Sequence, residues 1–131
     1  QRLSRGLGDV YKRQDIKVFG VTALTSLSDE DTEKIYKSTS FDHVSAMLDL
    51  AESAGIDGVV CSPHELNLVS KRKSLLSITP GIRIKKSKDD QKRIMSPKQA
   101  INLGADYLVI GRPITKSDNI EKSLNDIYES I

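Results

Sequence analysis

The sequence is poor in the residues that stabilise small secreted or all-β proteins. It has one cysteine, Cys61, and no tryptophan, and aromatic residues make up only 5% of its 131 positions. A single cysteine excludes an internal disulfide and fits a reducing compartment. The low aromatic content favours an aliphatic α/β core over an all-β one. The length suffices for one ordinary domain.

Long apolar runs are also missing. No stretch approaches the roughly 20 apolar residues of a membrane-spanning helix, and there is no signal-peptide pattern. We therefore expect a soluble, cytoplasmic protein without a membrane partner.

The sequence has only a small excess of positive charge, +2 at pH 7. Residues 1–14 contain four basic residues and one acidic residue, so 16 basic and 17 acidic residues remain in the rest of the chain, a net charge of −1. Because the body of the chain is close to neutral, we expect no nucleic-acid partner.

Residues 1–14 show neither strand alternation nor a helical apolar stripe. The segment Ser4–Gln14 looks like the translation of a transposon-derived adapter used in preparing sequencing libraries; a natural basic arm is the alternative. We interpret 1–14 as a non-native or disordered leader and 15–131 as the folded domain. On this interpretation the chain is a fragment of a longer protein.

Strand and helix patterns alternate along residues 15–131. Strands are predicted at 16–24, 57–61, 74–79 and 108–110 from their β-branched and apolar content. Amphipathic helices are predicted at 41–54 and 120–131. Further helices should begin after Ser28, Ser62 and Ser96, where side chains can cap them. Four strand–helix repeats predict an α/β fold with a parallel sheet and right-handed crossovers.

The last predicted strand ends in an anion-binding pattern. Leu108–Ile110 is an unbroken apolar run, which is typical of a strand buried on both faces. Gly111 follows at once and permits close approach to the backbone, and Arg112 adds a fork of donors suited to phosphate. Strand, Gly-Arg and helix are the parts of a phosphate site at the carboxyl edge of a parallel sheet. The alternative is a tight turn with a solvated arginine.

These loops resemble the carboxyl-terminal half of orotidine 5′-phosphate decarboxylases. The resemblance covers nearly all of 15–131. It is carried, in order and at family-like spacing, by Val-Thr-Ala-Leu-Thr-Ser (21–26), Asp-Gly-Val-Val-Cys-Ser (57–62), Thr-Pro-Gly-Ile-Arg (79–83), Asp-Gln-Lys-Arg-Ile-Met (90–95) and Tyr-Leu-Val-Ile-Gly-Arg-Pro-Ile-Thr (107–115).

The resemblance implies a partial (β/α)8 TIM barrel, with this chain supplying strands five to eight. It implies the last step of pyrimidine biosynthesis, from orotidine 5′-phosphate to UMP, with no metal or cofactor and with a homodimeric complete enzyme. Thr25 would lie at the pyrimidine end of the nucleotide. The phosphate would be held by Arg83, Gln91, Gly111 and Arg112.

The catalytic residues of that family are absent from this sequence. The family's lysine–aspartate array has the signature Asp-x-Lys-x-x-Asp, and no such stretch occurs here; Asp89-Asp90-Gln91-Lys92 has the wrong order. We therefore predict no catalytic residue in this chain and no activity of the chain alone. A sugar-phosphate decarboxylase of the same superfamily and a non-catalytic phosphate-binding module are the alternatives.

Three further residues carry weaker signals. Cys61 ends an apolar strand and is interpreted as a buried small hydrophobe. His43 and His64 have no metal-ligand companion at a useful spacing, so no metal site is predicted.

Overall fold

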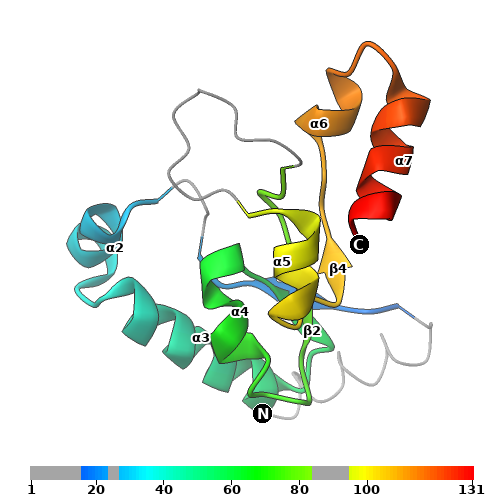
Figure 1. Cartoon of the computed structure of the whole chain (residues 1–131). Coiled ribbons are helices and arrows are strands. Elements are labelled where there is room, and N and C mark those ends of the chain that lie inside the picture. Colours follow the sequence, from blue (N-terminus) through cyan, green and yellow to red (C-terminus); the bar gives the residue numbers. More distant parts are fainter. Residues whose placement is uncertain (1–15, 24–26, 84–94) are drawn as a thin grey trace.

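The computed structural model describes residues 16–23, 27–83 and 95–131. In chain order its elements are β1 (Phe19–Val21), α2 (Asp29–Tyr36), α3 (Ser40–Ala54), β2 (Gly58–Val60), the 3-10 helix η1 (Pro63–Glu65), α4 (Leu66–Val69), β3 (Leu76–Thr79), α5 (Pro97–Asn102), β4 (Tyr107–Leu108), α6 (Arg112–Thr115) and α7 (Ile120–Ser130). Strands alternate with helices as predicted (Figure 1).

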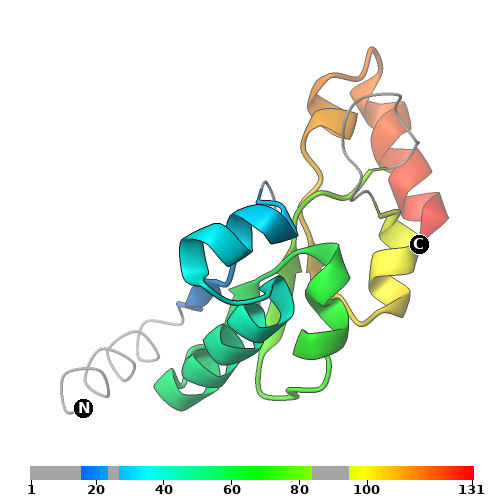
Figure 2. The ribbon, with the colours of Figure 1, turned by 90° about the vertical axis from the view of Figure 1, so that its left-hand side faces the viewer.

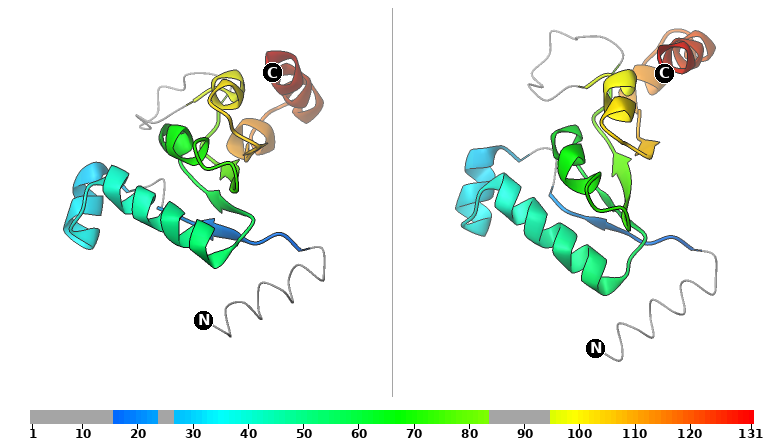
Figure 3. Two further views of the ribbon diagram at one scale, coloured as in Figure 1. Left: turned by 90° about the horizontal axis from the view of Figure 1, so that it is seen from below. Right: turned by 60° about the horizontal axis from the view of Figure 1, so that its bottom comes forward.

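The four strands form one parallel sheet in chain order, β1-β2-β3-β4. In the register, Val21 lies beside Val60, and Ile78 lies between Val60 and Tyr107. In a parallel sheet each connection must return the chain to the end of the sheet at which the strands begin. The helices α3, α4 and α5 make these connections along one face of the curved sheet (Figure 3). The prediction of four βα units around a parallel sheet is confirmed.

The helix ends follow the capping residues of the sequence. Ser28, Ser62 and Ser96 each accept a hydrogen bond from a backbone N–H in the first turn and form capping boxes. Such caps satisfy donors that have no partner within the helix. Gly55 ends α3 with φ 68°, and Gly104 follows α5 with φ 92°; both are left-handed conformations that favour glycine.

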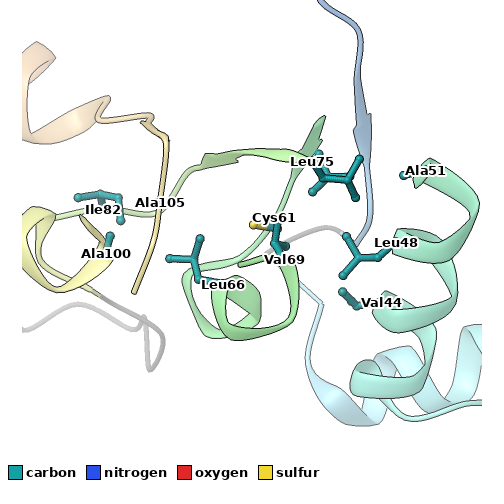
Figure 4. Close-up of a cluster of buried hydrophobic side chains, with 11 residues drawn as sticks. Val44, Leu48, Ala51, Cys61, Leu66, Val69, Leu75, Ile82, Ala100 and Ala105 are labelled. Carbon is teal, nitrogen blue, oxygen red and sulfur yellow. The ribbon is translucent and has the colours of Figure 1, made fainter. Parts of the chain in front are cut away.

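The core lies between the sheet and its covering helices. Val44, Leu48 and Ala51 lie on one face of α3, and Leu66 and Val69 come from α4. Figure 4 shows Cys61 between Leu66 and Val69 on one side and Val44 and Leu48 on the other. Further along the chain Leu75, Ile82, Ala100 and Ala105 extend the cluster. The core is aliphatic, as the composition predicts.

Two aspartates tie the beginnings of neighbouring strands together. The Asp57 carboxylate accepts a hydrogen bond from the Val18 N–H at 2.8 Å. The Asp106 carboxylate accepts from the Ser77 N–H at 2.8 Å and from its hydroxyl at 3.0 Å. Each aspartate therefore joins the chain before its own strand to the preceding strand of the sheet.

The prediction that Leu108–Ile110 is buried on both faces is wrong. β4 spans Tyr107–Leu108, and the side chains of Tyr107 and Val109 are 48% and 49% exposed. β4 has one neighbour, β3, so it is an edge strand. Among the residues described, nothing covers the side of the sheet opposite to α3, α4 and α5 at these positions. The strand is therefore short and open on its concave side.

The closing helix α7 is also less buried than its pattern predicts. It packs against α5 and α6, at the opposite end of the helix row from α3 (Figure 2). Ile127 is buried, whereas Ile120 and Leu124 remain 54% and 37% exposed. Within the described ranges no helix is long and apolar enough to cross a membrane.

Candidate functional site

The Gly-Arg segment lies where the sequence places it, directly beyond β4. The carbonyl of Gly111 accepts hydrogen bonds from the N–H groups of Ile114 and Thr115, at 2.9 and 3.0 Å, which starts the short helix α6. A Cβ atom added at Gly111 would meet no protein atom within 4 Å. Open space therefore adjoins this backbone, as a ligand that approaches it requires.

Arg83 reaches the same region from the neighbouring strand. It follows β3 and the turn at Pro80-Gly81, and Gly81 has φ 80°. The Arg83 N–H donates to the carbonyl of Met95 at 3.1 Å, and Ile82 bridges to Met95 in parallel fashion. The backbone of Arg83 is thus fixed by the chain that leads into α5.

Arg83 and Arg112 line one surface pocket of about 560 Å³. The remaining lining comes from α6, α7 and the turn between them: Pro113, Lys116, Ser117, Asp118, Asn119, Lys122, Ser123 and Asp126. Four of the lining side chains are basic and two are acidic, so the pocket carries a positive excess that favours anions.

The wall of this pocket is held by local hydrogen bonds. The Ser123 hydroxyl donates to the carbonyl of Pro113 at 2.8 Å and joins α7 to α6. The Asn119 side chain accepts from the Lys122 N–H at 2.9 Å and caps α7. The two helices lie side by side at the same end of the sheet (Figure 1). The positions of Lys116 and Lys122 are thereby fixed relative to Arg112.

Two basic residues of the pocket, Lys116 and Lys122, are not among the site residues predicted from the sequence. Lys116 lies four residues after Arg112, a spacing that puts two residues on the same side of a helix, so its place beside Arg112 could have been predicted. Lys122 had no comparable signal, because its place in the pocket depends on how α7 packs on α6.

The other two predicted binding residues, Thr25 and Gln91, lie outside the described residues. Of the predicted binding residues that the structure describes, Arg83 and Arg112 line the same pocket, and Gly111 is the chain neighbour of Arg112.

Cys61 takes no part in this pocket. Its side chain is buried in the core, and this burial raises the pKa of the thiol to about 11. The interpretation of Cys61 as a small core residue is confirmed. His43 stacks on Tyr36 with ring centroids 3.9 Å apart, and His64 is exposed on η1. In the part of the chain that the structure describes, no group of three acidic, histidine or cysteine side chains could hold a metal ion.

Fold and site together define a parallel βα protein with a basic pocket at the carboxyl edge of its sheet. A family model described as "Orotidine 5'-phosphate decarboxylase / HUMPS family" matches residues 5–127. The chain belongs to this family. The match begins within residues 1–14, so the domain boundary at residue 15 stays a prediction.

Curated relatives agree with this assignment. The orotidine 5′-phosphate decarboxylase of Shewanella sediminis is 48% identical to this chain over 92% of its length. That of Vibrio cholerae is 43% identical over 98% of its length. These matches cover 53% and 57% of the relatives. The chain thus spans about half the length of the curated relatives that it matches.

Solved structures give the same picture. The crystal structure of orotidine 5′-phosphate decarboxylase from Lactobacillus acidophilus is 30% identical, with a TM-score of 0.70 over 87% of this chain and 48% of that one. The enzyme from Pyrococcus horikoshii is 20% identical with a TM-score of 0.64, which bears on the fold alone. The chain matches about half of each barrel.

Proposed function

We propose that this chain carries the phosphate-binding half of an orotidine 5′-phosphate decarboxylase. The observation that supports the proposal most strongly is the shared pocket of Arg83 and Arg112, in a chain 43–48% identical to relatives of that name. The substrate would be orotidine 5′-phosphate and the product UMP. The chain would correspond to strands five to eight of the barrel.

Within this proposal the two arginines bind the phosphate monoester. Guanidinium groups offer paired N–H donors that match two phosphate oxygens, and Gly111 lets the backbone approach the same group. Thr25 would contact the pyrimidine, and Gln91 would contact the phosphate from the segment between Arg83 and Met95. Binding energy gained at the phosphate stabilises a transition state whose reacting carbon lies elsewhere on the substrate.

The chemical step needs groups that this sequence does not contain. The Asp-x-Lys-x-x-Asp signature, whose lysine would protonate the C6 carbanion, is absent from the 131 residues. We therefore propose that this chain alone binds but does not decarboxylate. The complete enzyme would be a homodimer in the cytoplasm and would use no metal or cofactor.

Binding of the product tests the proposal. UMP and uridine differ by the phosphate, so their affinities for the 131-residue chain, measured by isothermal titration calorimetry, isolate its contribution. Arg112 is exposed, so we expect Arg112→Ala to weaken UMP binding by about 1.5 kcal/mol, or roughly tenfold, the low end for a charge-assisted bond. Uridine binding should not change.

Lys71→Ala is the matched control. Lys71 is exposed in the turn before β3, at the amino-terminal end of the strands and thus at the end of the sheet opposite to the pocket, and it does not line the pocket. Its removal lowers the net charge equally and should leave UMP affinity unchanged. Equal losses for UMP and uridine in Arg112→Ala, or equal losses in both variants, would contradict a phosphate site at Arg112.

A further inference from the structure

The positive excess of the pocket at the end of the sheet depends on two lysines. Its charged lining consists of two arginines, two lysines and two aspartates: Arg83, Arg112, Lys116, Lys122, Asp118 and Asp126. The charges of the two aspartates offset those of the two arginines, so the arginines alone would leave the pocket with no net charge. The two lysines raise the net charge to +2, from four basic minus two acidic side chains.

The backbone of Lys116 is bonded directly to that of Arg112. The Lys116 N–H donates to the Arg112 carbonyl at 3.0 Å, at the end of α6. This bond sets the two residues one helical turn apart, and residues at this spacing lie on the same side of a helix. Lys116 therefore lies beside Arg112 in the wall of the pocket.

Lys122 reaches the same pocket from the other helix. It lies in the first turn of α7, where its N–H donates to the Asn119 side chain at 2.9 Å. The next residue, Ser123, is buried, and its hydroxyl donates to the Pro113 carbonyl at 2.8 Å. The start of α7 is thus fixed against α6, and the two lysines line the pocket from two different helices.

Neither lysine is neutralised by an acidic neighbour. In the part of the chain that the structure describes, none of the ion pairs includes Lys116 or Lys122. Asp126 lies four residues after Lys122 on α7, a spacing at which an ion pair can form, yet these two side chains are not paired there. Both ammonium groups are therefore available to an anion in the pocket.

We propose that Lys116 and Lys122 are affinity-determining residues for the phosphate of the nucleotide and act through their charge. This role rests on the proposed function, because it concerns the same pocket. A phosphate monoester carries a charge of about −1.5 to −2 at pH 7, which the net charge of the pocket balances. Both lysines are exposed, so solvent screens their attraction, and each contributes less than a guanidinium group in direct contact.

Titration of the 131-residue chain with UMP tests this role, by calorimetry at about 10 mM salt, where the Debye length is about 30 Å. Lys116→Ala and Lys122→Ala should each weaken UMP binding about two- to fivefold, the range for exposed charge pairs, and the double variant roughly tenfold. Lys116→Arg keeps the charge and should keep the affinity. Uridine binding should not change in any variant, and Lys71→Ala should again leave UMP affinity unchanged.

Asp126→Asn makes the opposite change in the same pocket. It removes a negative charge and should strengthen UMP binding about two- to fivefold at low salt. At 1 M salt the Debye length is about 3 Å, so the effects of the lysine and aspartate variants should fall below about 1.5-fold. Arg112→Ala removes a direct contact and should still weaken binding there. A general loss of structure would produce neither the gain in Asp126→Asn nor the recovery in salt.

The outcomes separate this role from the phosphate site itself. Unchanged UMP affinity in the double lysine variant at low salt, with Arg112→Ala still weakening it, would overturn the role of the lysines and leave the phosphate site at Arg112 in place. A loss shared by uridine, or one that also occurs in Lys116→Arg, would overturn it as well. If Arg112→Ala and the lysine variants all left UMP affinity unchanged, the proposed function would fail together with this inference.

Discussion

Gly58 in the second strand is the glycine at which the structure leaves least room for a side chain. A Cβ atom there would overlap the carbonyl oxygen of Leu76 and lie 2.6 and 2.8 Å from two ring carbons of Phe19. The Phe19 ring covers this position and meets the Tyr107 ring edge-on, with centroids 6.3 Å apart. The oxygen belongs to the paired neighbouring strand, so it cannot move without disturbing the sheet.

Gly58→Ala should therefore destabilise the fold. Overpacking in a core costs about 1–3 kcal/mol, and alanine recovers about 0.4–1 kcal/mol by restricting the unfolded chain. We expect a net loss of about 1–2 kcal/mol in the free energy of unfolding, measured by urea denaturation at one fixed protein concentration. Adding Phe19→Leu to this variant should restore part of the loss, because it removes the two ring contacts but not the contact with Leu76.

Gly111→Ala is the matched control, because no protein atom lies near its added Cβ. Its stability should stay within about 0.5 kcal/mol of the parent chain. If Gly58→Ala were equally neutral, the close packing of Phe19 over β2 would be wrong.

Three other predictions concern single side chains. Because burial raises the pKa of the Cys61 thiol to about 11, a maleimide at neutral pH should label it slowly in the native chain and rapidly in denaturant; equal rates would show that Cys61 is accessible. Asp106→Ala leaves the buried Ser77 N–H without its acceptor and should cost about 1–2 kcal/mol by urea denaturation, whereas an unchanged midpoint would make this contact incidental. Hydrogen bonds from Ser28 hold the pKa of Asp31 below its usual value, so Ser28→Ala should raise it in an NMR titration; the associated stability is present above the unfolded-state pKa of Asp31 and is lost as pH falls through the folded-state value.

The features that sequence predicts well here are local. Ser28, Ser62 and Ser96 begin helices because a hydroxyl and a residue three positions on complete the cap within one turn. The left-handed positions Gly55 and Gly104 follow from the same short-range geometry. Strand and helix alternation then determines a parallel sheet, since consecutive parallel strands need crossovers.

The features that sequence does not predict depend on distant neighbours. The apolar run at 108–110 indicates burial, yet Val109 is half exposed because burial requires a strand beyond β4. The contact of Asp106 with Ser77 and the place of Lys122 in the pocket likewise depend on tertiary packing. Arg83 and Arg112 could be paired from sequence only through the family resemblance, because they are separated by 29 positions.

A decarboxylation assay separates phosphate binding by this chain from the chemical step. The fall in orotate-type absorbance of orotidine 5′-phosphate is followed with the chain alone, and then with the separately expressed amino-terminal half of a full-length relative. We predict no turnover by the chain alone. We expect turnover in the mixture that Arg112→Ala reduces strongly and Lys71→Ala preserves. Turnover by the chain alone, abolished by Arg112→Ala, would show that the proton donor lies within these 131 residues and that the chain is more than a binding half.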